Sequence, residues 1–172
     1  MNKNLDQQKL CRLALSLGAQ NALVFTLDDI IFDPRTIIKC MFGCGDWGKG
    51  LTCPSRAGAL SIEQWHNTLN CYQWGIIIHG QEAKLNQDIA YELERQAFFS
   101  GYYFAFSMSD CKLCAACAGY DNEPCRFPQK ARPAFHSVGI DVFATARRFG
   151  LPIETLEQEG RPQNWYAAVF IE

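Results

Sequence analysis

Seven of the nine cysteines in this 172-residue chain lie in two short segments. The first cysteine segment, residues 39–54, reads KCMFGCGDWGKGLTCP, and its thiols form the first cysteine group: Cys40, Cys44 and Cys53. The second cysteine segment, residues 110–128, reads DCKLCAACAGYDNEPCRFP, and its thiols form the second cysteine group: Cys111, Cys114, Cys117 and Cys125. Thiols gathered at such short spacing are typical of disulfide frameworks, zinc sites or iron–sulfur sites.

The rest of the composition favours metal over disulfides. Hydrophobic residues make up 48% of the chain, so a core can form without disulfide bonds as support. The N-terminal stretch MNKNLDQQKLCRLALSLG lacks the apolar run of a secretory signal, and no later stretch is long enough to span a bilayer. We therefore expect a cytoplasmic chain with reduced thiols. The odd number of cysteines also argues against a complete set of disulfide pairs. The net charge of −2, with mixed signs, gives no reason to expect nucleic acid or a membrane as partner.

Apolar periodicity predicts helices that alternate with strands. Helices are expected at residues 10–17, 61–69, 81–99 and 137–149. Ser61 and Gln64 form a capping box at the start of the second of these. Strands are expected at residues 72–80 and 101–108, with a hairpin or bent strand at 22–32 and two further strands in 151–172 joined at Gly160-Arg161-Pro162.

This alternation predicts an α/β fold in one domain spanning residues 1–172. We expect a sandwich with a mixed sheet of about five strands, helices packed on the sheet, and both cysteine segments in loops at strand ends. The first cysteine segment is rich in glycine and ends at Pro54, which predicts irregular loop throughout.

The second cysteine group has the spacing of an iron–sulfur site. Cys111, Cys114 and Cys117 follow the C-x2-C-x2-C run that opens the cluster motif of bacterial ferredoxins. Ala115 and Ala116 between them let the backbone approach a cluster closely. Cys125 follows after seven residues instead of the three of ferredoxins, so it either completes this site or reaches another cluster. Zinc is the alternative, but zinc sites are typically built from two separated cysteine pairs.

The first cysteine group has a C-x3-C-x8-C spacing in a loop with four glycines. Lys39, Lys49 and Arg56 add positive charge, which suits an anionic cluster, although a zinc loop or ordinary buried thiols are alternatives. Three thiols leave one position of a second [4Fe–4S] cluster without a cysteine. Cys11 or Cys71 could supply the fourth thiol, but both are expected to be core residues. Otherwise the iron at the position without a cysteine is open to water, a histidine or a substrate.

Both segments, with ARPAFHSVGIDVFATARRFG after Cys125, resemble a family of small cysteine-rich proteins of anaerobic bacteria and archaea. That family is described as predicted metal-binding proteins of unknown function (domain of unknown function 2284). The likeness includes LGAQNAL at residues 17–23 and Trp47-Gly48-Lys49, but Ser55 stands where the pattern has a second proline after Pro54. The resemblance implies metal or iron–sulfur binding through all seven cysteines, and it implies no particular reaction.

Three functions follow from these observations, and whether the chain is an enzyme stays open. The first is electron transfer with a partner protein through one or two [4Fe–4S] clusters. The second is an enzyme that binds a small molecule, for example in sulfur chemistry, at an open iron on the first cysteine group. The third is a zinc-stabilised structural or adaptor module. His136 is a more plausible extra ligand than His66 or His79, and Arg126 and Arg132 could offset cluster charge or dock an acidic partner.

Overall fold

The computed structural model describes residues 6–155 and 162–172. In these ranges the α-helices are α1 (Gln7–Ser16), α2 (Thr36–Gly43), α3 (Ile62–Leu69), α4 (Ala83–Phe99) and α5 (Val142–Arg148). The strands are β1 (Asn21–Thr26), β2 (Trp74–Gly80), β3 (Phe106–Ser109) and β4 (Trp165–Phe170). Three short 3-10 turns complete the described structure: η1 (Leu27–Asp29), η2 (Ala118–Asp121) and η3 (Phe135–Val138). None of the described helices is long and apolar enough to cross a membrane.

The α/β class is confirmed, but the predicted mixed sheet of about five strands is wrong. The described residues form one four-stranded sheet in the order β1-β2-β4-β3, and every neighbouring pair is antiparallel. Residues 22–32 contain a single strand because the Asp29 carboxylate accepts from the Thr26 backbone at 2.9 Å and turns the chain into η1. Residues 151–155 are not a strand either. Gly160 and Arg161, in the predicted turn before β4, lie outside the described residues.

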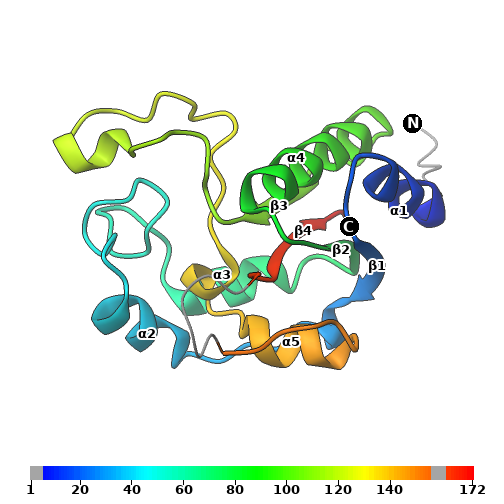
Figure 1. The fold of residues 1–172 in the computed structure, drawn as a ribbon, viewed down its shortest axis with the longest axis horizontal. Helices are drawn as coiled ribbons and strands as arrows, with labels where there is room; N and C mark the ends of the chain where they lie inside the picture. Colours follow the sequence, from blue (N-terminus) through cyan, green and yellow to red (C-terminus); the bar gives the residue numbers. More distant parts are fainter. Residues whose placement is uncertain (1–5, 156–161) are drawn as a thin grey trace.

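The sheet is covered on both faces, and its side chains alternate between two cores. On one face the strands pack against α1 and α4 through Ile76, Ile78, Ala167, Val169 and the helix residues Leu10, Ile89 and Leu93. The opposite core contains Phe25, Ile77, Met108, Ala168 and Phe170, with Leu69 of α3 and Ala146 of α5. Figure 1 shows α4 above the sheet and α5 below it. The last strand, β4, lies between β2 and β3, so both of its pairings join parts of the chain that are distant in the sequence.

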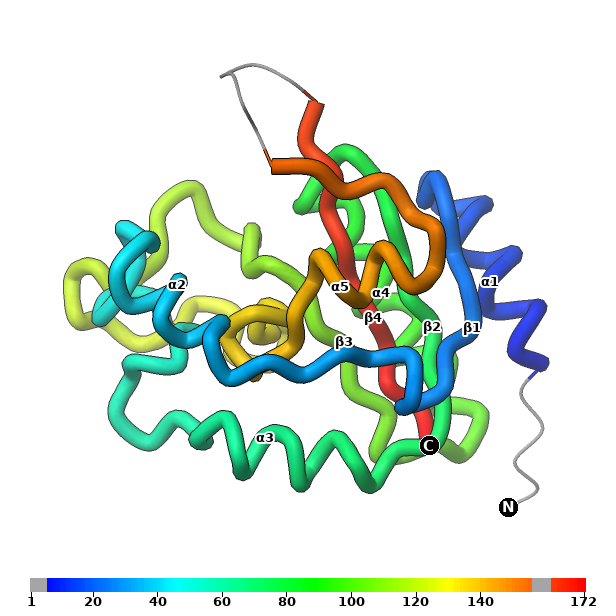
Figure 2. The backbone as a smooth tube through the Cα atoms, turned by 90° about the horizontal axis from the view of Figure 1, so that it is seen from below, coloured from blue at the N-terminus to red at the C-terminus, as the bar shows by residue number. Residues whose placement is uncertain are grey.

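The four predicted helices are confirmed with shifted boundaries, and α2 is a helix that was not predicted. The Ser61–Gln64 capping box is present, and α4 begins two residues later than predicted. The helix expected from residue 137 begins only at Val142, because Gly139 adopts a φ of +91° and Asp141 caps the new start. The first cysteine segment is not wholly loop, since Cys40 lies on α2. In Figures 1 and 2 the two cysteine segments lie side by side, beyond one end of the sheet.

Candidate metal centre

The seven clustered cysteines line two adjoining cavities. A cavity of about 120 Å³ contains the first cysteine group together with Cys111. A cavity of about 200 Å³ contains the complete second cysteine group: Cys111, Cys114, Cys117 and Cys125. Both cavities are lined by Asp46, Gly50, Thr52, Cys111 and Lys112. The two groups are therefore brought together, and Cys111 lies at their boundary.

Side-chain contacts hold the two segments against each other. The Tyr120 hydroxyl of η2 donates a hydrogen bond to the Asp46 carboxylate of the first segment. The Lys49 ammonium lies 5.9 Å from the centre of the Tyr120 ring. Gly119 packs so closely on the first segment that a Cβ there would stand 2.2 Å from the Lys49 carbonyl oxygen. Only glycine fits this contact without a backbone shift.

The first cysteine group is ordered by α2 and by Ser55. Cys40 is buried on the helix, and the Cys44 backbone donates to the Cys40 carbonyl at 3.3 Å where the helix ends. The Ser55 hydroxyl accepts from the Gly48 backbone at 2.7 Å and lies 2.9 Å from the Cys53 sulfur. Ser55, which the sequence marks only as a departure from a family pattern, thus orients one candidate ligand.

The first cavity concentrates groups that become negative when ionised. Burial raises the pKa of the Cys40 thiol to about 11, and the nearby Cys44, Cys53 and Asp110 add to the rise. Burial also raises the pKa of the Asp110 carboxyl, whereas His136 and Lys112 act in the opposite direction. Thiolates are the form that binds metal, so a bound cation would stabilise the deprotonated group that this cavity disfavours by itself.

The second segment is tied to the helix and sheet beneath it. The Lys112 backbone donates to the Gln87 side chain of α4 at 2.8 Å, directly after Cys111. Arg126, next to Cys125, lines the second cavity and donates to the Ala116 carbonyl at 3.1 Å. The first bond ties the start of the segment, next to Cys111, to α4, and the second ties its end, next to Cys125, to the middle of the loop.

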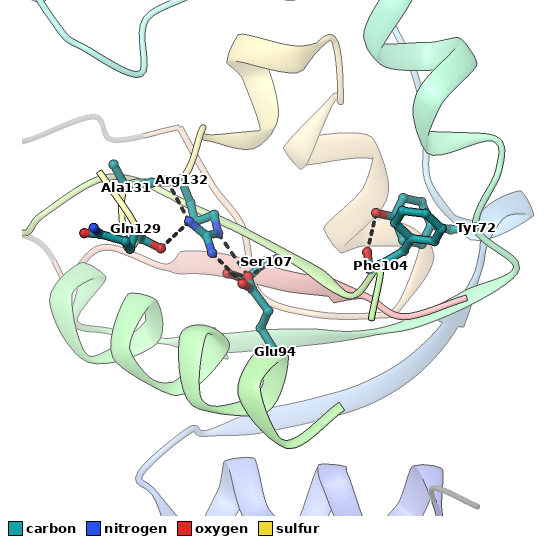
Figure 3. Close-up of polar contacts among 7 residues, drawn as sticks. All are labelled: Tyr72, Glu94, Phe104, Ser107, Gln129, Ala131 and Arg132. Carbon is teal, nitrogen blue, oxygen red and sulfur yellow. Dashed lines mark hydrogen bonds and ion pairs between the residues drawn. The ribbon is translucent and has the colours of Figure 1, made fainter. Parts of the chain in front are cut away.

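Arg132 anchors the chain that leaves the second segment (Figure 3). Its guanidinium pairs with Glu94 of α4, and both side chains are nearly buried, at 11% and 14% exposed. The Ser107 backbone and hydroxyl of β3 donate to the same Glu94 carboxylate at 2.7 and 2.6 Å. The expectation that Arg132 docks a partner or offsets cluster charge is not supported, because its charge is compensated inside the fold.

The remaining candidate ligands occupy different surroundings. Cys11 is buried on α1 and Cys71 is exposed just after α3, and neither lines the two cysteine cavities. His79 is buried in β2 with its ring nitrogens 2.9 and 2.8 Å from the Asn21 and Asn164 side chains. His66 packs on Phe32. His136 of η3 is the histidine that lines the first cysteine cavity.

The donor chemistry fits a thiophilic metal site. All nine cysteines are free thiols, and thiolates select zinc and iron–sulfur clusters. Within residues 6–155 and 162–172, no three His, Cys, Asp or Glu side chains stand close enough to hold a single ion. A cluster makes a different demand, because its cysteines bind separate irons and need not converge on one point. The seven thiols in two adjoining cavities supply the type of donor atom that such a cluster needs.

The chain matches the family described as predicted metal-binding protein (DUF2284) over residues 24–171. The chain belongs to this family. The match spans both cysteine segments and the sheet from the second half of β1 to β4, so the family description covers most of the sheet as well as the candidate metal centre. Comparison with curated proteins gave no match, and comparison with solved structures gave none either.

Proposed function

We propose that this family member is an iron–sulfur protein that holds two [4Fe–4S] clusters and exchanges electrons with a partner protein. The observation that carries the proposal is the lining of two adjoining cavities by seven free thiols. Cys111, Cys114, Cys117 and Cys125 would supply four thiolates to one cluster, and Cys40, Cys44 and Cys53 three to the other. Bound clusters would supply one-electron chemistry.

The surrounding residues support an exchange of electrons near the surface. Cys44 of the first cysteine group and Cys111 of the second are exposed, so each group has one member at the surface. Lys112 lines both cavities and Arg126 lines the second, where their positive charge would offset anionic clusters. A reducing cytoplasmic setting belongs to the proposal, because cluster cysteines must stay out of disulfides.

Metal analysis after oxygen-free purification tests the proposal. We expect about eight irons with matching acid-labile sulfide per chain, a brown colour and little zinc. Cys71→Ser is the matched control, because that cysteine lies outside both cavities and its loss leaves the iron content unchanged. About four irons would limit the proposal to one cluster, and zinc without sulfide would contradict it in favour of a structural zinc module.

A second candidate function is catalysis at the first cysteine group. The observation that favours it is that Asp110 and His136 line both the first cysteine cavity and a neighbouring cavity of about 440 Å³. Three thiolates leave one iron position open, and an open position acts as a Lewis acid. Added cyanide or thiol that changes the electron paramagnetic resonance of the wild type supports catalysis. A spectrum that such ligands leave unchanged supports a pure electron carrier.

A further inference from the structure

A cavity of about 440 Å³ lies beside the first cysteine group, and none of its described lining residues is a cysteine. It lies between η3, the start of α5 and the entry to β4. Its described lining consists of Asp110, Phe135, His136, Val142, Phe143, Ile153, Glu154, Thr155, Gln163, Asn164, Trp165 and Tyr166. The volume is within the range of small-molecule sites, which are concave and mostly apolar.

The walls of this cavity are aromatic and largely preformed. Phe135 and Tyr166 are 4% and 5% exposed and belong to the core beneath the sheet. The Tyr166 hydroxyl donates to the Pro152 carbonyl, which fixes the ring at the cavity wall. Phe143 on α5 and Trp165 on β4 are half-buried, so their rings have one part in the protein and one part facing the cavity.

The ionisable acids and bases named in the described lining are Asp110, Glu154 and His136, and His136 and Lys112 lie near Asp110. Asp110 and Glu154 contribute carboxylates, and no lysine or arginine is among the described lining residues. Two side-chain cations that are not part of the lining contact its aromatic rings. The Lys112 ammonium lies 5.6 Å from the centre of the Trp165 ring, and the Arg147 guanidinium lies 5.7 Å from the centre of the Phe143 ring. These contacts show that the rings offer cation–π interactions, and Lys112 and Arg147 take one such site on each ring themselves. Aromatic walls with carboxylates attract a positively charged organic group and repel an anion.

We propose that this cavity binds a small organic amine whose flat apolar body lies among Phe135, Phe143 and Trp165 and whose ammonium group faces Asp110 and Glu154. A ligand bound there adjoins the first cysteine group, because Asp110 and His136 line both cavities. The proposal needs no metal, so it stands or falls separately from the iron–sulfur assignment.

A series of three probes of similar shape tests the ligand class. Benzylamine is cationic, benzyl alcohol is neutral and benzoate is anionic at neutral pH. Each is titrated into the full-length protein while the indole N–H signal of Trp165 is followed by nuclear magnetic resonance. We expect saturable shifts with benzylamine, weaker binding of benzyl alcohol, and no binding of benzoate at the same concentrations. Equal or tighter binding of benzoate, or no saturable benzylamine binding, overturns the proposal.

Two substitutions separate the apolar wall from the charge. Phe143→Ala should abolish benzylamine binding, whereas Phe99→Ala, an exposed phenylalanine outside the cavity, should not change it. If Phe143→Ala fails to fold, Phe143→Leu is tested in its place, because leucine keeps much of the side-chain volume but has no aromatic ring. Glu154 is exposed, so Glu154→Gln should reduce the preference for amine over alcohol by roughly two- to fivefold. An unchanged preference in Glu154→Gln, or unchanged binding in both Phe143 variants, contradicts the proposed pose.

Discussion

The Tyr120 hydroxyl of the second cysteine segment donates a hydrogen bond to the Asp46 carboxylate of the first, although the two residues are 74 positions apart. This bond raises the pKa of the Tyr120 phenol to about 12, so the phenol keeps its proton throughout the physiological range. Asp46 lines both cysteine cavities. The contact therefore connects the two groups of candidate ligands.

Tyr120→Phe removes this bond and keeps the ring. Because Tyr120 is on the surface, we expect little change in the unfolding temperature but a severalfold faster loss of iron to a chelator. The rate of decay of the visible cluster absorption measures this effect. Tyr103→Phe is the control, since Tyr103 is more exposed and lies away from the cysteine cavities. Equal rates in both variants would mean that the bond does not stabilise the paired segments.

Gly119→Ala should force the two segments apart. The new Cβ would meet the Lys49 carbonyl oxygen at 2.2 Å and Leu51 at 2.9 Å, so the backbone has to move. We expect a loss of about 1–3 kcal/mol in unfolding free energy, as for other overpacked contacts, together with reduced iron content. Gly45→Ala is a control in the first segment, because nothing lies within 4 Å of its added Cβ. Full iron content in both variants would contradict the close contact at Gly119.

Glu94→Ala should destabilise the fold strongly. It leaves the nearly buried guanidinium of Arg132 unpaired and removes the acceptor for two Ser107 donors. Breaking such a pair costs about 3–5 kcal/mol. Glu92→Ala on the same helix breaks a more exposed pair with Arg95, for which about 1 kcal/mol or less is expected. Urea unfolding of both variants measures the difference, and similar losses would mean that the buried pair has no special role.

Tyr166 should make the stability of the fold depend on alkaline pH. Burial raises the pKa of this phenol to about 12, above the value near 10 of an unfolded chain. Its contribution is therefore complete below pH 10 and is lost as the pH rises towards 12, on the order of 2 kcal/mol in total. In Tyr166→Phe the unfolding free energy should fall less steeply over this interval. Parallel curves for the two proteins would contradict the assigned shift.

Elements with local signals could be predicted from the sequence. The Ser61–Gln64 capping box and the buried stripe of α4 depend on residues three or four positions apart. The sheet order could not be predicted in this way. It depends on pairs such as Ile78 with Ala167, which carry no mark of their partner and place the last strand at the centre.

The candidate site likewise has features that local sequence predicts and features that depend on distant residues. The seven cysteines are visible in the sequence because their spacing is local. The two segments that carry them meet through long-range contacts such as the Tyr120–Asp46 hydrogen bond, and neither residue type predicts a distant partner. Gln87, which accepts from the Lys112 backbone, has no sequence signal either. An arginine is normally expected on the surface, but the Arg132 side chain is nearly buried in an ion pair with Glu94.

Electron paramagnetic resonance of the fully reduced protein tests the central claim, that seven thiols hold two clusters side by side. Two nearby paramagnetic clusters split or broaden each other's signal. We expect such a coupled spectrum in the wild type, and a simple single-cluster spectrum with about half the iron in Cys40→Ser/Cys44→Ser. A wild-type spectrum identical to that of the double variant, or a zinc-containing protein with no signal, would contradict the account.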